Sequence, residues 1–222
     1  GNNFVGLGTD AQHGVWTVSV NGGVDRLDAQ NGKVEHVSER LPVGDLRPLS
    51  VLADQQHQLW IGHRAGLGIF DLDKNTLQAL PLDAKRDDAL MPGVFNILLA
   101  CPEQTIWASA RGGALHRIDA KTHAITRFVV GASGLASVDI TALRCDAQAK
   151  LWLAHAEGLQ FFDAASQQFV SPKGAPSQRV HALSFAADGT LWLHTLGALE
   201  RFRVDASGLK SLQRIDAADG WP

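Results

Sequence analysis

One stretch decides the fold of this chain: Gln58-Leu-Trp-Ile-Gly-His-Arg-Ala-Gly-Leu-Gly-Ile-Phe-Asp71. It predicts a short strand centred on Trp60, a turn closed by Gly66 and a second strand that ends at Asp71. The same order of tryptophan, glycine and an apolar segment closed by aspartate returns four more times, around Trp16, Trp107, Trp152 and Trp192. Successive tryptophans are 44, 47, 45 and 40 residues apart. A period in this range is typical of propeller blades, each a four-stranded sheet that cannot bury its faces alone.

Every repeat contains four short segments rich in β-branched, leucine and aromatic residues, separated by turns rich in Asp, Asn and Gly. Such segments predict strands joined by tight hairpins, and no segment keeps a helical period beyond two turns. We therefore predict an all-β chain of five four-stranded propeller blades, with residues 1–222 forming a single propeller domain or a fragment of one. The approximate blade ranges are 3–37, 47–80, 94–128, 138–170 and 179–214.

Composition narrows the classes of function. The 222 residues carry a net charge of −3, so the sequence lacks the excess of positive charge that is typical of nucleic-acid-binding proteins. No run of about 18 apolar residues is present, so the sequence predicts membrane attachment only through segments outside it. The two cysteines, Cys101 and Cys145, stand six and seven residues before a tryptophan in adjacent repeats. We expect two unpaired, mostly buried thiols, with a disulfide between neighbouring blades as the alternative.

The repeat resembles a known family. Its pattern is an aspartate, then Leu-Trp-(Ile/Leu), then one or two glycines, then an apolar segment ending in aspartate. This pattern resembles the two-component regulator propeller repeat, which builds the sensor propellers of bacterial hybrid histidine kinases and related receptors. The closing Asp219-Gly-Trp-Pro222 is similar to the start of a following repeat in that family. One departure is Cys101, which stands where Asp10, Asp54 and Asp146 precede their tryptophans by six residues.

The resemblance implies a function and a location. It implies a ligand-sensing module of a bacterial two-component or related signalling receptor, in which the propeller binds and does not catalyse. It also implies a periplasmic location and an attached output domain. From the way such receptors signal, we further expect a homodimer. Because most closed propellers complete one blade with strands from both chain ends, we expect the five repeats to be part of a larger propeller. A self-contained five-bladed propeller is the alternative.

Polar side chains follow the second strand of each repeat and predict a binding rim. Three positions after each tryptophan stand Ser19, His63, Ala110, His155 and Thr195. In a four-stranded blade these turns lie at the same end as the crossings between blades, so polar groups from successive blades share one rim. The candidate ligand-binding residues are Asn21, His63, Arg64, Arg111, His155, Glu157 and His194.

The chemistry of these residues suits a small anion or sugar. The planar forks of Arg64 and Arg111 match a carboxylate or sulfate, and Asn21 and Glu157 match sugar hydroxyls. Hydroxyl and imidazole groups directly after a strand also bond turn amides, so a purely structural role for each remains open.

Other classes of site have weaker support in the sequence. No histidine pair has zinc-like spacing with a third ligand nearby, so we predict no metal and no cofactor. No Gly-x-Ser-x-Gly elbow is present, and His155 with Glu157 is the nearest approach to the histidine and glutamate of streptogramin-lyase-like propellers. The alternatives to a ligand sensor are a protein-interaction propeller and, behind it, such a lyase-like enzyme.

Overall fold

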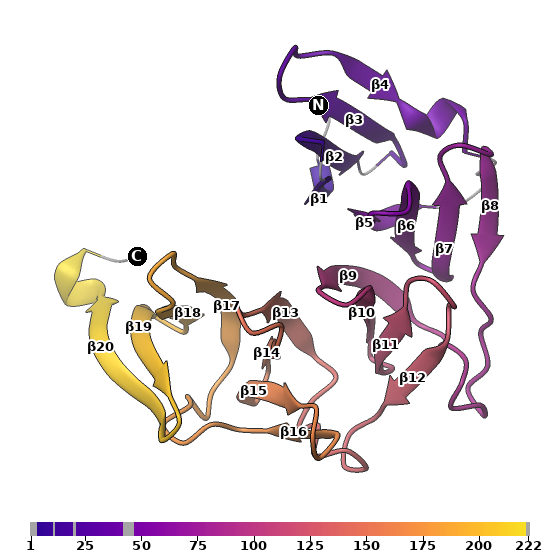
Figure 1. Cartoon of the computed structure of the whole chain (residues 1–222). Helices are drawn as coiled ribbons and strands as arrows, with labels where there is room; N and C mark the ends of the chain where they lie inside the picture. Colours follow the sequence, from indigo (N-terminus) through magenta and orange to yellow (C-terminus); the bar gives the residue numbers. More distant parts are fainter. Residues whose placement is uncertain (1–3, 11, 20, 42–46, 221–222) are drawn as a thin grey trace. The chain divides into compact units, whose positions relative to one another are not determined.

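The five predicted blades are confirmed. In a computed structural model of the chain, the described residues 4–10, 12–19, 21–41 and 47–220 form five four-stranded antiparallel sheets. In every sheet the strands are hydrogen-bonded in chain order, which is the order of a propeller blade (Figure 1). Position 3, the predicted start of the first blade, and the closing residues 221 and 222 lie outside the described residues.

The strands follow the predicted segments closely. Blade 1 consists of β1 (Phe4–Thr9), β2 (Gly14–Ser19), β3 (Val24–Asp28) and β4 (Val34–His36), followed by the short helix η1 (Val37–Glu39). Blade 2 consists of β5 (Pro48–Ala53), β6 (Gln58–His63), β7 (Gly66–Asp71) and β8 (Thr76–Ala79). Blade 3 consists of β9 (Val94–Cys101), β10 (Thr105–Arg111), β11 (Leu115–Asp119) and β12 (Ile125–Phe128).

The last two blades follow the same plan. Blade 4 consists of β13 (Ile140–Cys145), β14 (Leu151–His155), β15 (Gly158–Asp163) and β16 (Gln168–Val170). Blade 5 consists of β17 (Val180–Phe185), β18 (Leu191–Thr195), β19 (Ala198–Asp205) and β20 (Gly208–Asp216), followed by η2 (Ala217–Asp219). The final hairpin is longer than the others: β19 and β20 pair from Ala198 with Asp216 to Asp205 with Gly208, and Asp205 accepts the Ser207 amide at 2.8 Å in the turn.

The chain divides into two compact units, residues 1–127 and 128–222. The first holds blades 1 and 2 and blade 3 up to Arg127, and the second holds blades 4 and 5. That residues 1–222 form one propeller domain stays a prediction.

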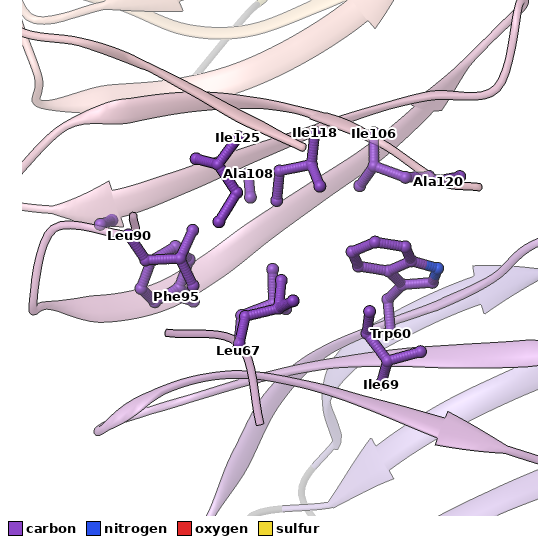
Figure 2. Packing of buried hydrophobic residues seen from close by; sticks show 12 residues of the cluster. Trp60, Leu67, Ile69, Leu90, Phe95, Ile106, Ala108, Ile118, Ala120 and Ile125 are labelled. Carbon is purple, nitrogen blue, oxygen red and sulfur yellow. The ribbon is translucent and has the colours of Figure 1, made fainter. Parts of the chain in front are cut away.

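Within each unit the core lies between neighbouring blades. Between blades 2 and 3, Trp60 and Ile69 face Ile106 and Ile118 of the next sheet (Figure 2). The corresponding clusters join blade 1 to blade 2 around Trp16, and blade 4 to blade 5 in the second unit. Both faces of an inner blade are therefore apolar, which explains why the strands are nearly continuous runs of apolar residues.

The aspartate six residues before the tryptophan has a structural role. In blades 1, 2 and 4 its Oδ2 accepts the indole N–H of that tryptophan, at 2.9, 2.7 and 2.9 Å. In the same three blades Oδ1 accepts two amides of the turn between the first and second strands. One carboxylate thus satisfies a buried indole and closes the hairpin that precedes it.

The expectation of two unpaired thiols is wrong. Cys101 and Cys145 are both disulfide-bonded, and no free cysteine is present in the described residues. Sequence spacing does not settle such a bond, because it depends on how closely the two Cα atoms approach.

Candidate functional site

The predicted rim consists of the turns between the second and third strands of the blades. In blade 2, His63 pairs with Gly66 across a two-residue turn, and Arg64 is the first residue of that turn. In blade 3, the Ala110 amide donates to the Ala114 carbonyl at 2.9 Å, and Arg111, the last residue of β10, directly follows Ala110. Arg64 and Arg111 therefore occupy corresponding positions in two blades that pack directly on each other.

Both arginines are available to a ligand. The side chains of Arg64 and Arg111 are exposed, and neither makes a hydrogen bond or ion pair within the part of the chain that the structure describes. Most other arginines differ in this respect: Arg26, for example, bonds Asp10 at 2.7 Å. Unpaired guanidinium groups at equivalent turns of neighbouring blades make this end of the first unit attractive to an anion.

Two of the candidate histidines support their turns. His63 is buried, and its Nδ1 accepts the amide N–H of Ala65 at 3.2 Å. His155 is buried in the same way, and its Nδ1 accepts the amide of Glu157 at 3.1 Å. Burial lowers the pKa of both imidazoles, which favours the neutral form that can accept these bonds. The two histidines hold the turns that present Arg64 and Glu157.

The rim of the second unit contains a buried imidazole nitrogen without a partner. His155 is 1% exposed, and its Nε2 has no hydrogen-bond partner among the residues that the structure describes. Glu157, in the same turn, is exposed. His194 lies on β18 of the neighbouring blade, one residue before the position that corresponds to His155, with its ring 5.2 Å from the ring of His181.

The structure thus groups the seven candidate residues within each unit. The first unit presents Arg64 and Arg111 at matching turns, His63 beneath one of them, and Asn21 exposed in the turn of blade 1. The second unit presents His155 and Glu157 in one turn, with His194 on the next blade. The ligand-binding role of these residues stays a prediction.

A second set of polar residues fixes the crossings between blades, and the sequence reasoning missed it. His116 on β11 is fully buried, and its Nε2 accepts the amide of Met91 at 2.9 Å while Nδ1 lies 3.3 Å from the Ala108 carbonyl. Burial lowers the pKa of His116 to about 4, so the ring is neutral, with its proton on Nδ1.

Gln160 occupies the same position in blade 4. Its Oε1 accepts the Ala136 amide and its Nε2 donates to the Gly134 carbonyl, both at 2.9 Å. In both blades one polar side chain of the third strand, directly after Leu115 or Leu159, holds the incoming crossing by hydrogen bonds. The signal in the sequence is a polar residue within an otherwise apolar segment, directly after Leu115 or Leu159.

The sequence reasoning also missed a cleft at the opposite end of blades 4 and 5. It has a volume of about 700 Å³ and lies between the first turns of the two blades. On the wall of the cleft, the Asp188 carboxylate accepts the Thr190 amide N–H at 3.0 Å and pairs with the Arg201 guanidinium at 2.5 Å. The charges of Asp188 and Arg201 therefore cancel. The apolar part of the lining includes Phe185 and Val204.

A metal site has no support in the described residues. Among them, no three His, Cys, Asp or Glu side chains are grouped as a metal ion needs. Nor does any helix in that part of the chain have the length and apolar character to cross a membrane.

Comparison with known proteins supports the fold. No protein-family model matches the chain, and no curated protein matches its sequence. Solved structures do match. One is the extracellular domain of BT4673 of B. thetaiotaomicron, assigned as a hybrid two-component system, with a TM-score of 0.72 and 15% identity over 96% of this chain and 31% of that one.

Propellers of other kinds are equally similar in structure. Virginiamycin B lyase from Staphylococcus aureus matches with a TM-score of 0.72 and 13% identity, over 99% of this chain and 72% of the lyase. The β-propeller domain of Cps50 (Swd1) from Myceliophteria thermophila matches with a TM-score of 0.69 and 13% identity, over 97% of this chain and 72% of that one.

These likenesses establish the architecture, and identities of 13–15% leave the function to be argued from the residues. The chain spans about a third of the length of the BT4673 domain, with 31% covered. The chain is therefore a set of five four-stranded β-propeller blades, similar in structure to the extracellular domain of BT4673.

Proposed function

We propose that this chain is the ligand-sensing propeller module of a bacterial two-component or related signalling receptor, located in the periplasm, and that it binds without catalysing a reaction. The ligand is a small anion, such as an acidic sugar, held at the rim of the first unit. The single observation that carries the proposal is the pair Arg64 and Arg111. These are two exposed guanidinium groups that have no carboxylate partner in the described part of the chain, at the same turn of neighbouring packed blades.

The surroundings of Arg64 favour recognition of an anion. The turn that carries it is held by the bond from the Ala65 amide to His63, so little backbone entropy is lost when a ligand binds. A carboxylate or sulfate accepts two parallel bonds from a guanidinium fork, which gives orientation as well as affinity. Exposed polar groups such as Asn21 in the adjacent blade suit the hydroxyls of a sugar.

Signalling in this proposal is a population shift. A ligand that binds one arrangement of the propeller more tightly than another shifts the equilibrium toward it, and an attached output domain responds to the shift. The likenesses to the BT4673 domain and to virginiamycin B lyase are both likenesses of fold, so the proposal depends on Arg64 and Arg111.

Isothermal titration calorimetry with three matched sugars tests the proposal. Glucuronate and glucose 6-sulfate should bind, and neutral glucose should not. Arg64→Ala and Arg111→Ala should each weaken binding of the acidic sugars by about tenfold, and the double variant should abolish it. Arg203→Ala is the control, since Arg203 is also exposed but lies on β19 of the other unit. Equal binding of glucose, or acidic-sugar binding that survives the double substitution, would refute an anion-binding rim.

A further inference from the structure

A small cavity lies between blades 4 and 5, and none of its lining residues belongs to the predicted rim. Its volume is about 350 Å³, which is within the range of small-molecule sites. One wall is formed by blade 4, a second by the crossing that leaves β16, and a third by the turn between β19 and β20. All three walls belong to the second unit, so the cavity is formed within one compact part of the chain.

Blade 4 contributes an aromatic wall. Phe161 on β15 stands opposite Trp152 on β14, and their ring centroids are 5.3 Å apart. The residues that correspond to Phe161 in blades 1 and 5 are Arg26 and Arg201, and each of these pairs with the aspartate of its own first turn. Blade 4 departs from the repeat at this position, because it places a partly exposed aromatic ring against the cavity where two other blades place an arginine that is already paired.

A lysine lies over this ring. The ammonium group of Lys150 is 4.5 Å from the centroid of the Phe161 ring, within the range of a cation–π contact. The Lys150 side chain is exposed and forms no ion pair with another described residue. Lys173, which lines the cavity from the crossing, is likewise exposed and has no ion-pair partner in the described ranges. Both lysines can therefore pair with the charge of a ligand.

The carboxylates near these lysines are engaged by their own turns. Asp205, in the lining of the cavity, accepts the amide and the hydroxyl of Ser207 at 2.8 and 2.6 Å. Asp163, at the end of β15, accepts the hydroxyl of Ser166 at 2.6 Å. Because the lining contains two lysines and one aspartate, it carries an excess of positive charge, which favours an anion.

The third wall is held in place by the tip of the long hairpin of β19 and β20, which lies beside the crossing that follows β16 (Figure 1). The Leu209 amide donates to the Lys173 carbonyl at 2.7 Å. Two glycines allow this approach, since a Cβ atom on Gly208 would stand 2.3 Å from the Lys173 carbonyl oxygen. A Cβ atom on Gly174 would stand 2.5 Å from the Leu209 carbonyl oxygen. The wall is thus formed before any ligand binds, which lowers the entropic cost of binding.

We propose that this cavity binds a small aromatic carboxylate. The ring of the ligand packs among Phe161, Val170 and Val204, where it leaves water for contact with aromatic and branched side chains. Its carboxylate accepts charge-assisted hydrogen bonds from Lys150, and Lys173 adds positive charge. This inference does not rest on the proposed function, because it concerns the other unit and uses none of the residues of the rim.

Fluorine NMR with three matched probes tests the site. The signal of para-fluorophenylacetate should broaden when the chain is added. The neutral para-fluorobenzyl alcohol keeps the ring without the charge, and fluoroacetate keeps the charge without the ring, so each should bind at least about tenfold more weakly. Equal binding of the alcohol would show an apolar cavity in which the lysines have no part, and equal binding of fluoroacetate would show a general anion site. Either result would overturn the proposal, as would an unchanged signal of the aromatic acid at millimolar concentration.

Methionine variants place the ligand in this cavity, because they keep the length of a lysine and remove its charge. Lys150→Met should weaken binding of para-fluorophenylacetate by about tenfold, and Lys173→Met by about threefold. Lys210→Met is the matched control, since Lys210 is an exposed lysine of β20 outside the lining. Circular dichroism establishes that the three variants remain folded. Binding that Lys150→Met leaves unchanged, or that Lys210→Met weakens equally, would contradict the assignment.

The same titrations in the double variant Arg64→Ala/Arg111→Ala separate this site from the rim. Binding of para-fluorophenylacetate that persists in the double variant and remains sensitive to Lys150→Met supports the cavity, whatever happens to the acidic sugars. Binding that disappears with the two arginines belongs to the rim and overturns the further site. Failure of the rim proposal and failure of this one therefore give different results.

Discussion

Asp146 and Trp152 are joined by a hydrogen bond of 2.9 Å from the indole Nε1–H to the carboxylate Oδ2. The other carboxylate oxygen accepts the amides of Gln148 and Lys150, each at 2.9 Å. One side chain thus closes the first hairpin of blade 4 and satisfies the polar atom of its largest core residue. The same arrangement in blades 1 and 2 makes the aspartate and tryptophan a single structural unit of the repeat.

Removal of this carboxylate should destabilise the chain. Asp146→Ala leaves the buried Trp152 indole N–H and two turn amides without an acceptor, and should lower the free energy of unfolding by roughly 2–3 kcal/mol. Urea unfolding followed by tryptophan fluorescence measures the change. Asp205→Ala is the control, because Asp205 caps only an exposed turn through Ser207. An equal loss in the two variants would contradict the proposed role of the indole bond.

His116 should make the first unit sensitive to acid. Burial lowers its pKa from 6.5 to about 4, so between these values the unfolded chain binds a proton that the folded chain does not. The resulting stability is complete above pH 6.5 and is lost as the pH falls toward 4, by roughly 3 kcal/mol in total. Once protonated, Nε2 of His116 can no longer accept the Met91 amide N–H, so the hydrogen bond that holds the crossing into blade 3 is lost.

His116→Gln separates the clamp from its titration. Glutamine serves as the clamp in blade 4, so this variant should keep an acceptor for the Met91 amide and lose the pH dependence. Unfolding by urea at pH 7, 6, 5 and 4.5 should show a flatter profile than that of the unaltered chain. His13→Gln, at an exposed position in blade 1, should retain the original slope. An unchanged slope in His116→Gln would mean that other groups cause the acid sensitivity.

Gly158 should tolerate no side chain. Its φ is +132°, and a Cβ atom would stand 2.2 Å from the Pro176 carbonyl oxygen, where the crossing to blade 5 passes. Gly158→Ala should therefore cost roughly 2–4 kcal/mol in the second unit. Gly189 also has a positive φ, of +78°, but has open space around it, so Gly189→Ala should lower the free energy of unfolding by only about 1 kcal/mol. Thermal unfolding of the two variants gives the comparison, and similar midpoints would show that the crossing moves aside.

Asp10 should titrate differently once Arg26 is removed. Burial alone raises the pKa of this carboxyl, but hydrogen bonds from Arg26, the Gly14 amide and Trp16 outweigh it and hold the pKa at about 2. The stability from these bonds is complete above the usual aspartate pKa of about 3.9 and is lost as the pH falls toward 2. Arg26→Met should raise the pKa of Asp10, visible in the carbon chemical shift of its carboxyl by NMR. Arg40→Met, which removes an exposed arginine bonded to Glu35, should leave that shift in place.

The sequence by itself determined the blades. Five tryptophans in register, with turn residues at fixed offsets, predict five four-stranded blades because hairpins are local and each strand pairs with its chain neighbour. The aspartate before Trp16, Trp60 and Trp152 is visible in the sequence as a pattern. Its bond to the indole N–H cannot be predicted from that pattern, because the bond depends on the direction in which the tryptophan side chain points.

Only the tertiary structure decided what happens between strands distant in sequence. His63 and His155 turn inward and hold their turns, while Arg64 beside one of them stays free, a difference that depends on side-chain direction and not on spacing. The bond between His116 and the Met91 amide spans 25 residues, and both cysteines are disulfide-bonded although free thiols were expected. Contacts of this range depend on how the blades pack on one another, and the packing of side chains in three dimensions leaves no period in the sequence.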